Sequence, residues 1–106
     1  MSSPRSRYYI LIEGQPTPAD VRVWAQWMED CGEERLVNRT SIGSVGVSTV
    51  FLGLDHNFSK AGPPILYETM VFGGELNDCQ ERYSTQEMAL LGHEEWCDRV
   101  RKTQPS

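Results

Sequence analysis

Four side chains of this 106-residue sequence are candidates for chemistry. Asp55 and His56 stand where an apolar segment ends in a long loop, a position at which scaffolds commonly present functional groups. Glu68 interrupts the apolar segment ILYETMVF, and His93 falls in the apolar stripe of an expected helix. A carboxylate beside imidazoles could bind a metal ion or move a proton. The four residues therefore define a candidate ligand or metal site, although their spacing does not require them to meet.

Structural roles compete with this interpretation. A carboxylate among apolar residues, such as Glu68, needs a partner or a place at a sheet edge. A lone histidine in an apolar stripe, such as His93, is more often a core residue whose ring nitrogens are bonded within the fold. The sequence contains no G-x-x-x-x-G-K-[ST], G-x-S-x-G or H-E-x-x-H motif. We therefore expect a protein that is not an enzyme and that holds neither a cofactor nor a metal.

The elements that must position these residues alternate between strands and helices. The run YYILI predicts a strand that is covered by other parts of the chain. Thr17 is the expected N-cap of a helix that has Pro18 in its first turn and ends at Gly32. A second helix is expected after Ser84-Thr85-Gln86-Glu87, which has the sequence of a capping box. The expected strands cover residues 8–12, 35–40, 45–54, 65–72 and 81–83.

The order β-α-β-β-β-β-α predicts an α+β fold. We expect a single two-layer domain with a largely antiparallel sheet of four to five strands and two helices packed on one face. The domain would span residues 1–106, with an ordered core over about 8–101. The polar ends, 1–7 and 102–106, are expected to be frayed.

Negative charge is concentrated in one part of the chain. The net charge is −5, whereas residues 68–98 contain eight acidic residues and one arginine, which sum to −7. This excess disfavours binding to a nucleic-acid backbone and predicts a partner with a basic surface. An acidic surface that serves only solubility would have the same composition. The candidate partner-binding residues are the exposed acids and one tryptophan at the edge of an apolar stripe: Glu75, Asp78, Glu87, Glu94, Glu95, Asp98 and Trp27.

The remaining composition indicates a soluble protein in a reducing compartment. No apolar run approaches the roughly 20 residues that a membrane-spanning helix needs. The N-terminal residues MSSPRSR lack the apolar core of a signal peptide. Cys31, Cys79 and Cys97 are odd in number and widely spaced, which predicts reduced thiols.

Three segments carry a resemblance to a known family. VSTVFLGLDHNF (47–58), PPILYETMVFGG (63–74) and RYSTQEMALLGHEEW (82–96) together resemble small uncharacterised proteins that tailed bacteriophages and prophages encode. The resemblance covers roughly residues 8–101 and implies no particular activity. It implies an accessory protein of the bacterial host cytoplasm, a setting in which small acidic proteins often inhibit host systems.

Three functions are compatible with these features. The first is a binding protein that inhibits a host defence complex, such as a CRISPR–Cas effector, through its acidic surface. Its partner would be a protein or ribonucleoprotein, with no direct contact to nucleic acid or membrane, and the inhibitor could be a homodimer. The second is a protein that sequesters a nucleotide messenger with the 55–64 loop, Trp27 and one of Arg22, Arg35 or Arg39. The third is a metal-assisted hydrolase that uses Asp55, His56, Glu68 and His93.

Overall fold

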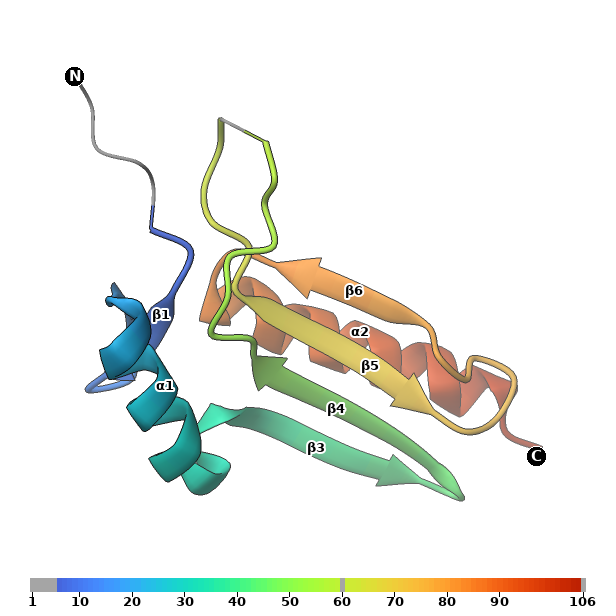
Figure 1. The fold of residues 1–106 in the computed structure, drawn as a ribbon. Coiled ribbons are helices and arrows are strands. Elements are labelled where there is room, and N and C mark those ends of the chain that lie inside the picture. The colour runs from blue at the N-terminus through green and yellow to red at the C-terminus, as the bar shows by residue number, and fades with distance from the viewer. Residues whose placement is uncertain (1–5, 60, 106) are drawn as a thin grey trace.

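The described residues fold into two antiparallel sheets, two α-helices and one short 3-10 helix (Figure 1). The computed structural model describes residues 6–59 and 61–105. The α+β class and the largely antiparallel sheet are confirmed. The elements, in chain order, are β1 (Tyr9–Ile12), β2 (Gln15–Pro18), α1 (Val21–Asp30), the 3-10 helix η1 (Gly32–Arg35), β3 (Leu36–Ile42), β4 (Val45–Phe51), β5 (Tyr67–Phe72), β6 (Gln80–Tyr83) and α2 (Gln86–Thr103).

The larger sheet is a meander of four strands in the order β3-β4-β5-β6, with all neighbours antiparallel. Along the central strand β4, buried side chains such as Val47 and Phe51 alternate with half-buried small residues such as Ser48. The neighbouring strand β5 alternates in the same way, from buried Tyr67 to buried Val71. This period of two buries one face of the sheet.

Helix α2 covers that buried face (Figure 1). Its N-cap is Thr85, whose hydroxyl accepts the Met88 N–H at 3.1 Å. Trp96, Cys97 and Val100 pack against valines of β4 and β5 in one hydrophobic cluster. The helix continues through Thr103 and so includes the first two residues of the segment 102–106, while most of the segment 1–7 lies outside the described residues.

The N-terminal segment differs from the prediction. Residues 9–18 form a β-hairpin whose turn has positive φ at Glu13 (51°) and Gly14 (78°). The first strand is not covered along its length, because Ile12 is 52% exposed. Strand β2 was not predicted, since its prolines suggested a helix start, but a sheet of two strands tolerates proline at its edges.

Helix α1 starts later than predicted and occupies a different place. Its N-cap is Asp20, which accepts the N–H groups of Arg22 at 2.9 Å and Val23 at 3.0 Å, so the predicted cap at Thr17 is wrong. The helix packs on β1 rather than beside α2 on the large sheet. Gly53, with φ of 78°, allows this approach, because a Cβ there would lie 3.2 Å from Trp24 Nε1.

Candidate functional site

The outward face of α2 combines exposed acidic and exposed apolar side chains. Since the opposite side of this helix is buried on the sheet, residues at three-and-four spacing point outward together. Glu87, Glu94 and Glu95 are exposed and form no ion pair within residues 6–59 and 61–105. Leu91 lies among them with 63% of its surface exposed. We call the exposed residues Glu87, Met88, Leu90, Leu91, Glu94, Glu95 and Asp98 the α2 outer face.

The charge of the helix changes sign toward its C-terminus. Asp98 forms an ion pair with Arg101 at 2.8 Å, and both side chains are more than half exposed. Arg101 and Lys102 occupy the last turn, where cations interact favourably with the carbonyl end of the helix dipole. Arg99 lies over the Trp96 ring at 3.9 Å from its centroid. The negative part of the α2 outer face is therefore its N-terminal and middle portion.

The acids of residues 68–98 do not form one continuous band. Glu81 accepts a hydrogen bond from Trp96 Nε1 at 2.9 Å, so that carboxylate serves the packing of α2 on β6. Glu75 and Asp78 are exposed in the turn between β5 and β6. Figure 1 shows this turn near the C-terminal end of α2, whereas Glu87 belongs to the first turn of that helix. The predicted partner-binding acids thus occupy two separate places.

Trp27 packs against the hydrophobic core and is not a fully exposed side chain. Its ring is half-buried and packs edge-on against Phe51, with the centroids 5.8 Å apart. It also lines a shallow, mostly apolar depression that includes Ile10 and Arg22. Arg35, another residue considered for ligand binding, donates from Nε to the Phe51 carbonyl at 3.0 Å and thereby braces the end of β4.

Asp55 organises the loop that follows β4. It is only 3% exposed, and its Oδ1 accepts the N–H groups of Asn57 at 2.8 Å and Ile65 at 2.9 Å. The bond from Ile65 connects the start of the 55–64 loop to its end, so the carboxylate closes the loop across ten residues of sequence. A buried charged acceptor with backbone donors is a structural device, and it explains the Asp at this strand end.

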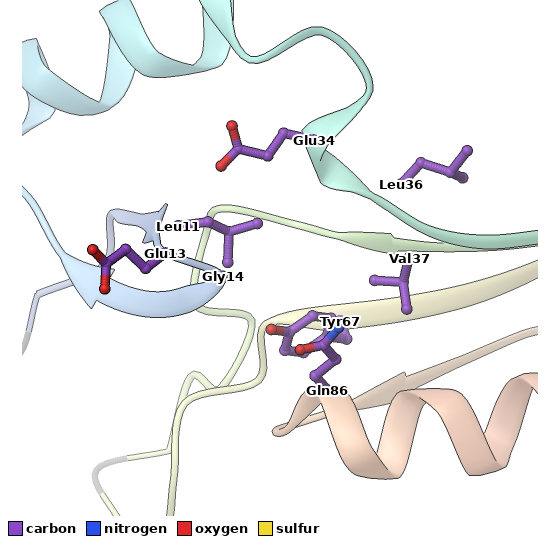
Figure 2. Close-up of a pocket in the computed structure, with 8 residues that line it drawn as sticks. All are labelled: Leu11, Glu13, Gly14, Glu34, Leu36, Val37, Tyr67 and Gln86. Atoms are coloured by element: carbon purple, nitrogen blue, oxygen red, sulfur yellow. The ribbon is translucent and has the colours of Figure 1, made fainter.

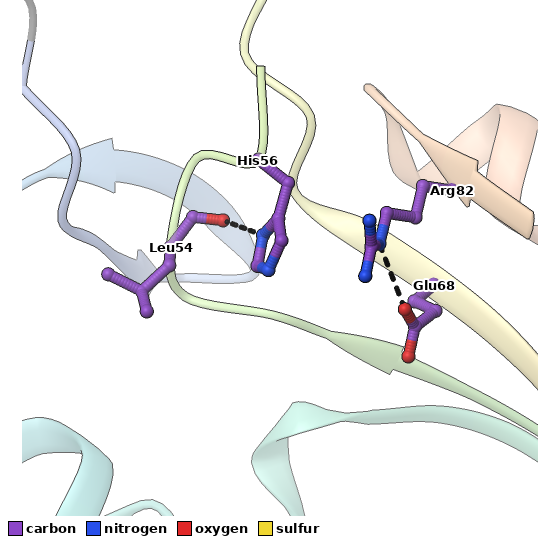
Figure 3. A network of polar contacts seen from close by, with 4 residues as sticks. All are labelled: Leu54, His56, Glu68 and Arg82. Carbon is purple, nitrogen blue, oxygen red and sulfur yellow. Dashed lines mark hydrogen bonds and ion pairs between the residues drawn. The ribbon is translucent and has the colours of Figure 1, made fainter. Parts of the chain in front are cut away.

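His56 and Glu68 also have local partners (Figure 3). His56 donates from Nδ1 to the Leu54 carbonyl at 2.9 Å, since a carbonyl oxygen can only accept. Glu68 pairs with Arg82 directly across the β5–β6 ladder, with Nε and Oε2 2.9 Å apart. The partner that Glu68 was expected to need is therefore its cross-strand neighbour.

His93 is fully buried between the helix and the sheet. Its Nδ1 lies 2.7 Å from the Thr49 hydroxyl, and its Nε2 lies 2.9 Å from the Thr40 hydroxyl. Burial lowers the pKa of this imidazole below its ordinary value of 6.5, and Glu94 opposes part of that effect. A neutral ring with one N–H can donate to one threonine and accept from the other.

This histidine belongs to a buried polar network that was not predicted. Thr49 and Thr69 are register partners in β4 and β5, and their hydroxyls share a hydrogen bond. Tyr83 donates to the Thr69 hydroxyl at 3.2 Å. Two threonines at inward positions of adjacent strands were the only signal in the sequence, and their pairing depends on the strand register.

The candidate ligand or metal set therefore does not assemble. His93 lies on the covered face of the sheet, whereas the Glu68–Arg82 pair is on the opposite face, and Asp55 is engaged by the loop. Within residues 6–59 and 61–105, no three His, Cys, Asp or Glu side chains are arranged to hold a metal ion. All three cysteines are free thiols, as predicted.

Comparison with protein-family models, curated proteins and solved structures found no match. Among the described helices, none combines the length and apolar character required to cross a membrane.

Proposed function

We propose that this protein is a non-enzymatic binding protein that docks its α2 outer face on a basic protein surface. The proposal rests on one observation: Glu87, Glu94 and Glu95 are exposed without ion-pair partners in the described chain and surround the exposed side chain of Leu91. Uncompensated carboxylates attract a cationic surface and speed association.

Apolar contacts would add affinity to this attraction. Met88 is 52% exposed, Leu90 42% and Leu91 63%, so three large exposed apolar side chains stand within about one turn of the helix, with Leu91 between the other two around the helix axis. Burying one such side chain contributes up to about 1.5–3 kcal/mol, an amount that a half-exposed residue gains only in part. An apolar centre beside charged groups is the usual arrangement of a protein interface.

The roles of the other polar groups support binding over catalysis. Asp55, Glu68 and His93, the residues best suited to chemistry, are each held by partners within the fold. We further propose that the chain is phage- or prophage-encoded, acts in the bacterial host cytoplasm and inhibits a host defence complex such as a CRISPR–Cas effector. That setting is supported by the resemblance of segments 47–58, 63–74 and 82–96.

The test is capture of a host complex by tagged protein at low and high salt. The variant Glu87→Lys/Glu94→Lys/Glu95→Lys reverses three charges of the α2 outer face. A matched control, Glu29→Lys/Asp30→Lys/Glu33→Lys, makes the same change in net charge at exposed positions of α1 and η1.

Wild type and control should capture the same complex, salt should weaken the capture, and the α2 variant should lose it. A catalogue of captured proteins is not enough by itself, so the captured complex is then assayed for inhibition by each form. Equal capture and equal inhibition by the two triple variants would overturn the proposal, provided that both retain the helical circular dichroism of wild type.

A further inference from the structure

A hollow of about 480 Å³ lies between the β1–β2 hairpin and the end of the large sheet (Figure 2). Its apolar lining comes from Leu11, Val37 and the ring of Tyr67. The carboxylates of Glu13 and Glu34 project from the hairpin turn and from η1, the two elements that face each other across the hollow. The hollow therefore combines an apolar wall with negative charge at its rim.

The Tyr67 hydroxyl in this lining is buried without a partner. Tyr67 is 1% exposed, and its hydroxyl forms no hydrogen bond within residues 6–59 and 61–105. Figure 2 shows the hydroxyl directed toward the hairpin turn at Gly14 and next to Gln86. Burial raises the pKa of this phenol, so it stays protonated and can both donate and accept. A buried hydroxyl without a partner is uncommon and calls for an explanation.

A second hollow of about 530 Å³ adjoins this one. The two hollows share Gly14, Tyr67 and Gln86 in their linings. Gln86 is exposed at the first position of α2, and its side chain makes no hydrogen bond in the described chain. A change of its rotamer would therefore break no hydrogen bond and would open space beside the Tyr67 hydroxyl, next to which Gln86 lies (Figure 2).

The charge of the two hollows, taken together as one joined space, determines which class of ligand fits. Glu13, Glu34 and Glu87 line it, and no described lysine, arginine or histidine does. This arrangement would repel the phosphates of a nucleotide messenger, so such a ligand does not fit here. It suits a cation that also has an apolar part.

We propose that the two hollows form a binding site for a guanidinium group on an apolar stem. A planar guanidinium offers five N–H donors, which can bond carboxylates such as Glu34 and the lone pair of the Tyr67 hydroxyl together. The stem would lie along Leu11 and Val37. A free alkylguanidine and an arginine side chain of a protein share this chemistry. The site shares Glu87 with the α2 outer face, but it can be tested apart from the proposed function, because a free alkylguanidine would bind without any partner protein.

The test is a titration of the isotopically labelled protein, followed by NMR, with three probes. Butylguanidine represents the free ligand, and acetyl-arginine amide represents a protein side chain. Acetyl-citrulline amide, which has the same shape without the charge, is the negative control. The first two should shift the Gly14 and Gln86 amide resonances, and citrulline should bind at least about tenfold more weakly. Tighter binding of butylguanidine points to a small-molecule ligand, and tighter binding of the arginine probe points to a protein.

Two pairs of variants separate a binding site from a structural role. Tyr67→Phe should weaken guanidinium binding by about tenfold while Tm stays the same or rises, because the variant removes a hydroxyl that has no partner in the free protein. Tyr8→Phe, outside both hollows, should leave binding unchanged. Glu34→Gln, at an exposed position, should weaken binding, whereas its neighbour Glu33→Gln should not. Failure of both charged probes to shift these resonances, or unchanged affinity in both Tyr67→Phe and Glu34→Gln, would overturn the proposal.

Discussion

The buried imidazole of His93 makes the stability of this protein depend on pH. In the folded state the ring is fully buried between two threonine hydroxyls, and its pKa is lowered by burial from 6.5. In the unfolded chain the ring is solvated and binds a proton below that ordinary value. The unfolded state therefore holds more protons than the native state in mildly acidic solution. Stability is fully present above the unfolded pKa and is lost as pH falls below it.

The size of this effect follows from one proton. A group that stays neutral in the native state while it protonates in the unfolded state changes the free energy of unfolding by at most about 1.4 kcal/mol per pH unit. Between about pH 7.5 and about pH 5.5, the contribution of His93 to the loss of stability therefore reaches at most about 1.4 kcal/mol. The carboxylates contribute little in this interval, because their ordinary pKa values lie well below it.

The assay is urea unfolding, monitored by tryptophan fluorescence, at the two pH values. His93→Gln removes the titrating ring but keeps an amide that can form a hydrogen bond with one threonine. Near neutral pH its free energy of unfolding should be about 1–3 kcal/mol lower than that of wild type. Its stability should then change less with pH than that of wild type. The control His56→Gln removes the other histidine and should keep the His93 contribution. If the free energy of unfolding changed with pH by the same amount in wild type and in His93→Gln, the role given to His93 would be refuted.

Three further predictions concern contacts that hold the fold. Asp55→Ala leaves two backbone N–H groups without their buried carboxylate and should lower the free energy of unfolding, measured in urea, by about 2–3 kcal/mol. Asp55→Asn keeps one side-chain oxygen as an acceptor and should therefore lose less of this free energy. Gly92→Ala places a methyl group against both the ring and the hydroxyl of Tyr83 and should cost about 1–3 kcal/mol in calorimetry; adding Tyr83→Phe should not recover this loss, because the ring carbons that meet the methyl group remain. A double-mutant cycle with Glu68→Gln and Arg82→Gln should give a coupling energy of only about 0.5–1 kcal/mol, because the Arg82 side chain is 40% exposed. This coupling energy should fall in high salt, and a value that salt leaves unchanged would contradict a solvent-exposed ion pair.

The C-terminal part of the fold was predictable because its patterns are long and regular. The segment over β4 alternates with a period of two, and the Thr85 region starts a helix whose buried residues repeat with helical spacing. Local periodicity therefore located these elements, although the strand expected over 45–54 ends at Phe51 and the strand expected from residue 65 begins at Tyr67.

The N-terminal hairpin shows where local patterns compete. Thr17 and Pro18 have the sequence of a helix start, but they belong to β2, and the helix begins after Asp20 instead. Both signals were present within four residues, and the pairing of β2 with β1 decided between them. That pairing could not be derived from the segment alone.

The candidate site was predicted in part. The exposed acids of α2 follow from the helical period, and all of them lie on its outward side. The partners of Glu68 and His93 depend on strand register and on the position of α2, which are long-range features. The unpartnered hydroxyl of Tyr67 had no sequence signal, since a tyrosine in a strand normally reads as a core residue.

The central claim is that the position of the negative charges on α2, and not the total charge, determines partner binding. The most direct measurement is the dissociation constant of the purified host complex with Glu87→Lys/Glu94→Lys/Glu95→Lys and with its charge-matched control on α1 and η1. The proposed function predicts that the α2 variant binds at least about a hundredfold more weakly than the control, since reversal of each charge replaces attraction by repulsion. Equal dissociation constants for the two variants would contradict it.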